Sequence, residues 1–311
     1  MLTLSDPDAA ALEDARRRGE YVWVDLLDPA DDVLRRTSQV LGVHPLALED
    51  SEEFSQRPKL DHYGDHLLLV FYGARLEEDG AISLVETHLV VGAQWLVTVR
   101  RHPCLSLDTL HDRGLADPGD DRWIVYRVVD ALTDSYFPVL NEIDQRVDQL
   151  EEEVLEGRVR DARRDTVVLR KPVLKIGRVL GAQRDVFDRS VPDLIRTPSL
   201  GPGAAAYLRD VQDHLHRLTD RADAERDRLT GLVHLSEDMT NTRLAAASER
   251  FALIATIFLP LTAVSSFFGM NFSWMVERLD SLGWFLALGI GLPTLLLAAI
   301  VLIIVRRGWS R

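Results

Sequence analysis

The sequence predicts an α+β protein with an N-terminal cytosolic α/β domain, a long helical stalk and two C-terminal transmembrane helices. Three observations support this class. Short runs of Val, Leu and aromatic residues, bounded by turn residues, fill the first 120 residues. Apolar residues spaced three and four apart follow, which is typical of long helices. Two long uncharged runs, residues 251–276 and 281–305, then close the chain.

The α/β domain is expected over residues 1–120. Asp28-Pro29, Gly73, Asp79-Gly80 and Gly92 are turn signals that separate four or five β-rich runs. Helical spacing lies between and around these runs. The expected strands are 21–27, 66–72, 84–91 and 95–99, and the expected helices are 31–41, 45–53 and 105–113.

Two antiparallel helices and a linker are expected over residues 121–203. Apolar residues from Ile124 to Val154 repeat at three and four residues, which predicts one unbroken helix of over thirty residues, from Arg122 to near Gly157. A second helix is expected over residues 158–188, with Pro172 as a candidate kink. Residues 191–203 are rich in Pro and Gly and are the expected linker.

The stalk is expected over residues 204–270 and continues into the first membrane span at about 250–270. Its apolar residues fit a heptad seam with Glu225 as the one polar interruption. A helix of this length would extend ~100 Å at 1.5 Å per residue. The seam consists of Leu208, Val211, Leu215, Leu218, Ala222, Leu229, Leu232 and Met239.

Each uncharged run is long enough to cross a bilayer core of ~30 Å. The connection is short, so an external loop is expected at 271–282, a second span at 283–305 and a tail at 306–311. Arginines lie before the first span and after the second, which predicts that both termini are cytoplasmic. We therefore expect a multi-pass protein of the cell inner (plasma) membrane. The single cysteine, Cys104, excludes an internal disulfide, and we expect it to be a small buried hydrophobe.

The net charge of −13 lies almost wholly in the soluble part, which therefore repels nucleic acid. Such a surface attracts cations, or it serves solubility alone. The chain has no phosphate-binding Gly-x-x-x-x-Gly-Lys-Ser/Thr loop and only three lysines, so no nucleotide is expected as a partner. No nucleophile, base and orienting acid form a recognisable motif, so an enzyme is not expected.

One face of the first span carries small or hydroxylated residues at helical spacing, among them Ser248, Ala255, Thr262 and Ser266. Such a stripe lines either a water-filled pore or a dry helix contact. The second span is uniformly apolar apart from Thr294 and suits contact with lipid. Two spans cannot enclose an aqueous path, so a conducting form requires a ring of several subunits.

Residues 254–262, followed by Phe268-Gly269-Met270-Asn271-Phe272, resemble the CorA family of divalent-cation channels, whose signature is Gly-Met-Asn at the end of the first of two C-terminal spans. The resemblance covers essentially the whole chain. It includes residues 56–60, 130–155 and 207–214. It implies a homopentamer with a funnel-shaped cytosolic part, with the first span lining the pore and the second outside it.

The resemblance implies that Gly269, Met270 and Asn271 form the selective pore mouth, where five Asn271 side chains hold hydrated Mg²⁺. Outside this context Asn271 would be interpreted as a helix cap or a loop hydrogen-bonding residue. The loop acids Glu277 and Asp280 would concentrate cations, although Ser273 and Val276 depart from the usual family pattern. The expected pore lining is Ser248, Phe251, Ala255, Leu259, Thr262 and Ser266, with Phe251 and Leu259 as apolar constrictions.

The resemblance also implies closure of the pore by cytosolic Mg²⁺ bound between subunits. The family's long-helix acid matches Asp210, with Asp213 one turn on. Partner acids from the next subunit are expected at Glu77, Glu78 and Asp79. Without the resemblance, Asp210 and Asp213 are ordinary solvated residues of a helix face.

The function that follows is passive, potential-driven uptake of Mg²⁺, and also of Co²⁺, gated by cytosolic Mg²⁺. The nearest alternative is a Zn²⁺ transporter of the ZntB type, which shares the architecture. A second alternative is a membrane-tethered coiled-coil sensor with no pore, in which the small-residue stripe is only a packing seam.

Overall fold

The structure is a computed structural model that describes residues 2–4, 9–113, 123–196, 202–270 and 272–306. The chain forms two compact units, Met1–Leu235 and Ser236–Arg311. The first unit contains the sheet and its covering helices. The second contains the apolar C-terminal helices.

The first unit contains a six-stranded mixed sheet, in the order β1-β2-β6-β5-β4-β3. β1, β2 and β6 are parallel, whereas β6-β5, β5-β4 and β4-β3 are antiparallel pairs. The four strands predicted from the sequence are present. The strands are β1 (Leu2–Leu4), β2 (Val22–Leu27), β3 (Lys59–Tyr63), β4 (His66–Leu76), β5 (Ile82–Val91) and β6 (Trp95–Arg100).

Two details of the sheet differ from the prediction. β1 and the polar β3 lack an apolar run and were not anticipated. Gly73 does not end a strand, because β4 continues to Leu76. A Cβ at Gly73 would lie 2.9 Å from Ser135 Oγ and 3.2 Å from Cys104 Sγ, so glycine allows a helix to approach the strand closely.

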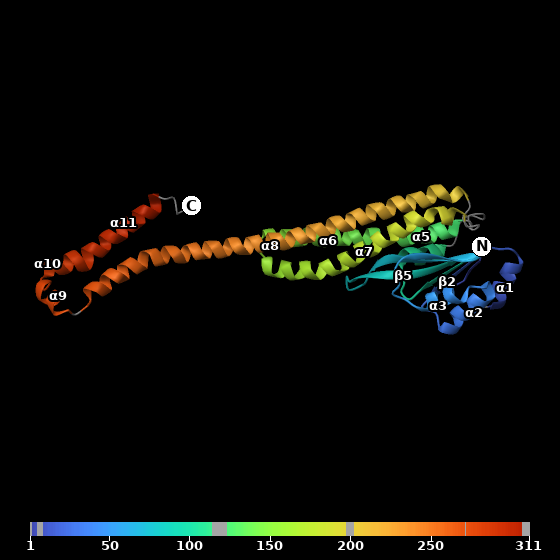
Figure 1. Ribbon diagram of the computed structural model, residues 1–311, viewed down its shortest axis with the longest axis horizontal. Helices are drawn as coiled ribbons and strands as arrows, with labels where there is room; N and C mark the ends of the chain where they lie inside the picture. Colours follow the sequence, from blue (N-terminus) through green and yellow to red (C-terminus); the bar gives the residue numbers. More distant parts are fainter. Residues whose placement is uncertain (1, 5–8, 114–122, 197–201, 271, 307–311) are drawn as a thin grey trace. The chain divides into compact units, whose positions relative to one another are not determined.

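Helices cover both faces of the sheet. α1 (Ala9–Arg17), α2 (Asp31–Leu41) and α3 (Pro45–Glu52) lie on one side in Figure 1, and side chains of α1 and α2 join the apolar core of that face. α4 (Leu105–Arg113) contacts the other face, where His111 packs edge-on against Trp23 of β2. Cys104, just before α4, is buried, as predicted.

The predicted helix of over thirty residues is two helices, α5 (Ile124–Asp134) and α6 (Tyr136–Leu155). The break at Ser135 follows from Pro138, which has no N–H for the carbonyl of residue 134 and whose ring crowds that carbonyl. α7 (Val159–Arg196) is longer than predicted and includes Pro172 and Pro192. The predicted start of the linker at residue 191 is therefore wrong, because residues 191–196 belong to α7. Residues 197–201 lie outside the described part, and a short 3-10 turn, η2 (Pro202–Ala204), follows.

The stalk helix is α8 (Ala205–Phe268). In the first unit α8 lies beside α5 and α6, with ion pairs from Arg228 to Asp144 and from His214 to Asp134. The predicted seam is buried from Leu208 to Leu232, and Met239 is half-buried. Glu225 is buried to 7% exposure beside Arg228, at 3.3 Å.

The second unit contains the end of α8, then α9 (Ser273–Arg278), α10 (Leu282–Trp284), the π-helical η3 (Phe285–Gly291) and α11 (Leu292–Arg306). Two segments, within Ala205–Phe268 and over Leu282–Arg306, are long and apolar enough to cross a membrane. None of the apolar window in either segment is buried within the chain.

Candidate metal sites

The Gly-Met-Asn segment directly follows the end of α8. The Gly269 N–H donates to the Ser265 carbonyl at 3.0 Å, and the Met270 N–H reaches the Phe267 carbonyl at 3.4 Å. Asn271 lies outside the described residues. A Cβ on Gly269 would be 3.1 Å from the Ser265 carbonyl oxygen, so a larger residue would disturb this helix end.

The six residues predicted to line a pore all lie on exposed positions of α8. The two bulkiest, Phe251 and Leu259, are 72% and 69% exposed. A different stripe of the same helix is partly covered, and it includes Leu253, Ile257 and Val264. At about 100° per residue, the covered stripe and the predicted pore face lie on opposite sides of the helix. The predicted pore face is therefore uncovered by its own chain, as are the bulky Ile254 and Phe258.

The loop between the spans contains the short helix α9, which the sequence did not predict. Glu277 lies in its last turn and Asp280 follows it, and both are exposed. The guanidinium of Arg278 lies 6.0 Å from the Trp274 ring.

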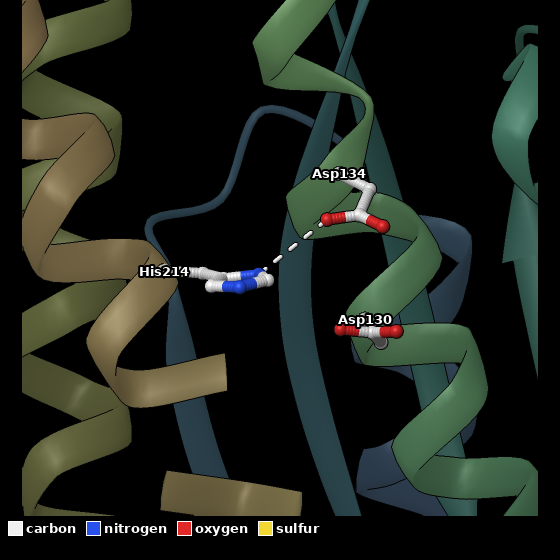
Figure 2. A group of neighbouring side chains, drawn as sticks. All are labelled: Asp130, Asp134 and His214. Atoms are coloured by element: carbon white, nitrogen blue, oxygen red, sulfur yellow. Dashed lines mark ion pairs between the residues drawn. The ribbon is translucent and has the colours of Figure 1, made fainter. Parts of the chain in front are cut away.

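A second group of metal-ligating side chains lies in the first unit. Figure 2 shows Asp130 and Asp134, one turn apart on α5, facing His214 of α8. One ligand atom from each residue lies within 4.8 Å of the others. His214 Nδ1 is 3.5 Å from Asp134 Oδ1, and its Nε2 is 3.8 Å from Asp210 Oδ1. Three carboxylates thus surround one imidazole.

The negative charge of these carboxylates is only partly balanced by neighbouring hydrogen-bond donors and by His214. Asp130 Oδ1 and His214 Nδ1 are buried and accept or donate no hydrogen bond within the described chain. Burial, together with the charge of Asp134, raises the pKa of Asp130 to about 6, although His214 and Tyr126 oppose the shift. Burial and the charges of Asp130 and Asp210 also raise the pKa of Tyr126 to about 12. A cation would satisfy the unpaired atoms and the excess charge together.

A cavity of about 330 Å³ borders the two aspartates, and its other polar lining residues are Ser106, Thr109 and Arg127. His214 does not line this cavity. Carboxylate oxygens suit Mg²⁺, whereas an imidazole nitrogen suits Co²⁺, Ni²⁺ or Zn²⁺ better. The mixed donor set therefore fits a divalent cation, with a preference for first-row transition metals.

The predicted regulatory residues occupy different places in this arrangement. Asp210 lies beside His214, whereas Asp213 is exposed and outside the group. Asp130 and Asp134 were not singled out, although two acids four residues apart on an otherwise apolar helix were a usable signal. His216, two residues further along α8, pairs with Asp188 at 3.3 Å.

Two of the three acids of the β4-β5 hairpin, Glu77 and Asp79, form contacts within their own turn. Glu77 pairs with Arg75 and accepts a hydrogen bond from Ser83 Oγ at 2.7 Å. Asp79 Oδ1 accepts the Ala81 N–H at 2.9 Å, and Glu78 is exposed. None of the three belongs to the metal-ligating group within this chain.

Comparison with known proteins relates these features to one family. The sequence profile of the CorA-like Mg²⁺ transporter protein family matches residues 18–307. The chain is 29% identical over 258 residues to the cobalt/magnesium transport protein CorA of Thermotoga maritima, covering 79% of this chain and 71% of that protein. It is 26% identical over 237 residues to the zinc transport protein ZntB of Yersinia enterocolitica, covering 74% and 70%.

Comparison of the fold with solved structures indicates the same family. The complete structure of the CorA magnesium transporter from Methanocaldococcus jannaschii superposes with a TM-score of 0.81 at 21% identity, covering 92% of this chain and 90% of that chain. The α/β domain, the long helix and the pair of apolar C-terminal helices are therefore the CorA-like fold. The chain belongs to the CorA-like Mg²⁺ transporter protein family, which is a family of membrane ion transporters and not of enzymes.

Proposed function

We propose that this protein is a passive divalent-cation channel of the cell inner membrane that admits Mg²⁺ and Co²⁺. The observation that carries the proposal is the Gly269-Met270-Asn271 segment at the end of the first of two apolar helices, in a chain that matches the family from residue 18 to residue 307. The relatives named as cobalt/magnesium transport proteins support the choice of ions.

The proposed pore is a ring of five α8 helices with both termini of each chain in the cytoplasm. Support comes from α8 itself, whose small and hydroxylated face is left uncovered by its own chain. Five Asn271 amide oxygens at the mouth would contact the water shell of Mg²⁺, which gives up its waters reluctantly. Neutral oxygens hold such an ion weakly enough to release it.

The driving force is the membrane potential. An inward-negative potential contributes ~2.3 kcal/mol per charge per 100 mV, and so about twice that for a divalent ion. This electrical energy is sufficient for uptake, so transport needs no nucleotide hydrolysis. The protein therefore acts as a channel and not as a pump.

Flux into proteoliposomes tests the proposal. The purified protein should admit Mg²⁺ and Co²⁺ under an inward-negative potential, and Asn271→Ala should abolish uptake while the assembly stays intact. Ser273→Ala, in the same loop, is the control and should retain flux. Undiminished Mg²⁺ uptake by Asn271→Ala would contradict the role of the amide ring.

We further propose that cytosolic divalent ions close the channel by binding at the Asp130, Asp134 and His214 group, with Asp210 beside it. The unpaired buried atoms and the raised pKa of Asp130 support a cation there. Two carboxylates ~4 Å apart repel by up to about 4 kcal/mol at an effective dielectric of 20. Without the ion, the carboxylates of Asp130 and Asp134 on α5 would repel Asp210 on α8, and this repulsion would favour separation of the two helices. Glu77, Glu78 and Asp79 remain the proposed partners from a neighbouring subunit.

Patch recordings with ions on the cytosolic side test this closure. Asp210→Ala and His214→Gln should require higher internal concentrations for closure, and His214→Gln should weaken closure by Co²⁺ more than by Mg²⁺. His216→Gln changes the neighbouring histidine, which faces Asp188, and should leave closure unchanged. If internal ions closed all three variants at the same concentrations as the wild type, a regulatory role for the group would be excluded.

A Zn²⁺ transporter is the second candidate function. The similarity to ZntB of Yersinia enterocolitica favours it. Parallel flux measurements with Mg²⁺, Co²⁺, Ni²⁺ and Zn²⁺ separate the two, because a Zn²⁺ transporter should carry Zn²⁺ and discriminate against Mg²⁺. Flux of any ion would also exclude the non-conducting sensor.

A further inference from the structure

A cavity of about 360 Å³ lies in the first unit, away from the metal-ligating group. Its walls come from the turn after α3, from β4 and β5, from the segment after β6, and from α7. The apolar wall includes Leu84 and Val179. The residues used below are Phe54, Ser55, Glu86, Arg101, His102 and Lys175, all of which line the cavity.

Basic side chains converge on this cavity in a chain with a net charge of −13. Arg101, His102 and Lys175 come from two separate segments, and Lys175 is one of only three lysines in the sequence. In the part of the chain that the structure describes, neither Arg101 nor Lys175 forms an ion pair with a carboxylate. The Arg101 guanidinium donates a 3.5 Å hydrogen bond to the Glu52 carbonyl.

The single acid in the cavity wall is already engaged. Glu86 accepts the backbone N–H groups of Ser55 at 2.6 Å and Gln56 at 2.9 Å, and it contacts His88 Nε2 at 2.9 Å. Burial pushes the pKa of Glu86 up, but His88 and the two N–H groups outweigh that effect and lower it. Glu86 is therefore engaged by these groups and forms no ion pair with Arg101 or Lys175 in the part of the chain that the structure describes.

The guanidinium of Arg101 is held in place before any ligand binds. It lies 4.4 Å above the Phe54 ring, which in turn stacks on buried His88 at 4.6 Å. Ser55, next to Phe54, has a left-handed φ of 76°, a conformation that costs energy for a residue other than glycine. The N–H contacts to Glu86 hold this turn, and so keep Phe54 under Arg101.

We propose that this cavity binds a small organic phosphate, with its phosphate group between Arg101 and Lys175 and its apolar part against Leu84 and Val179. A pre-positioned guanidinium matches phosphate oxygens in a bidentate manner, and a lysine adds a point charge. The volume suits a ligand of this size. This binding function is separate from ion transport and does not depend on it.

Phenyl phosphate is the probe, since it joins a ring to a dianionic phosphate. Full-length protein in lipid nanodiscs is titrated with it, and binding is followed by calorimetry and by ³¹P NMR. Lys175→Gln and Arg101→Gln should each weaken binding about tenfold, as expected for loss of one charge-assisted contact. Lys171→Gln is the matched control, one turn away on α7 and outside this cavity, and should change affinity less than about twofold.

Three results would overturn the proposal. The first is the absence of saturable binding of phenyl phosphate. The second is an equal loss in Lys175→Gln and Lys171→Gln, which would indicate general charge attraction. The third is equal affinity for benzyl alcohol, which would show that the phosphate contributes nothing. Arg101→Lys gives an independent check, because it retains the charge but not the planar stack and should still weaken binding severalfold.

Discussion

At the scale of single residues, Asp130 has a largely buried carboxylate whose negative charge lies close to two other acids. Its Oδ1 atom is buried without a hydrogen bond, and Asp134 and Asp210 are close enough to raise its pKa. Tyr126 Oη donates to its other oxygen at 3.3 Å, which relieves only part of the cost. A residue in this state responds both to protons and to divalent ions.

Stability should therefore depend on pH through Asp130. Its pKa is about 6 in the folded protein, against the ordinary 3.8. The favourable contribution is full below pH 3.8 and is lost as the pH rises through 6. After discounting for partial solvent exposure, about 1–2 kcal/mol should be lost between these values in chelator-treated protein.

Thermal unfolding with and without divalent ions measures this effect. Asp130→Asn should flatten the pH dependence between pH 4 and pH 7, and Co²⁺ should restore stability to the wild type at pH 7. Metal binding should weaken below about pH 6 as the carboxyl protonates. A pH profile identical in Asp130→Asn and wild type would contradict the assignment.

Gly73 is the second residue with a defined physical role. Gly73→Ala places a methyl group against Ser135, Leu132 and Cys104, all of them buried. Overpacking of this kind should destabilise the protein by about 1–3 kcal/mol. Gly181→Ala in α7 is the control, because nothing lies within 4 Å of its new Cβ, and it should be neutral or stabilising by up to about 1 kcal/mol. Chemical unfolding of the two variants measures both changes.

At the scale of elements, one arginine joins α6 to α8. Arg228 Nη1 lies 2.7 Å from Asp144 Oδ1, and Nη2 lies 3.5 Å from Glu151 Oε2. Asp148 also hydrogen-bonds to it, and this contact is the main cause that raises the pKa of Arg228. Glu225, which is buried on the same helix as Arg228, is the fourth carboxylate that contacts this arginine. The arginine therefore neutralises acids from two helices that would otherwise repel.

Arg228→Gln should loosen the contact between α6 and α8. Four carboxylates would lose their shared cation, so we expect a loss of about 1–3 kcal/mol that increases at low salt. Arg226→Gln is the control, since among the described residues Arg226 pairs with neighbours on its own helix, Asp223 and Asp227, and should cost less than about 0.5 kcal/mol. Hydrogen exchange in α6 and α8 should rise in the first variant alone. Similar exchange in both variants would show that the network is not a helix clamp.

At the scale of the whole molecule, both apolar helices of the second unit are uncovered. The apolar windows of both spans have no buried residue, and the predicted pore face of α8 is exposed along its length. A stripe that includes Ser248, Ala255, Thr262 and Ser266 is typical of a close helix contact or a water-filled path, rather than of a lipid-facing surface. Further copies of the chain are the natural cover for that stripe.

Purified protein should therefore have a mass of about five times the 35.0 kDa of one chain. Light scattering with subtraction of the detergent mass measures this directly, and chemical crosslinking should give a ladder that ends at five. A ladder that ends at two would favour the coiled-coil sensor. Phe251→Ala should not change the mass, because Phe251 is predicted to face the pore and not a neighbouring chain.

The sequence by itself determined the elements whose pattern is local. The four central strands, the heptad seam of α8 and the two apolar spans follow from periodicity and length, because burial requires apolar side chains at fixed spacing. The position of Asn271 after a span follows in the same way. The break at Ser135 was missed because a regular apolar pattern runs across it, although Pro138 marks it.

Only the tertiary structure decided which residues from distant segments meet. Asp130 and Asp134 face His214 across eighty residues of sequence, and Arg101 lies over Phe54 and lines one cavity with Lys175 of α7. No spacing rule contains these distances, because they depend on how helices pack on the sheet. Local periodicity specifies which face of an element is buried, whereas the partner that buries it is a property of the folded chain.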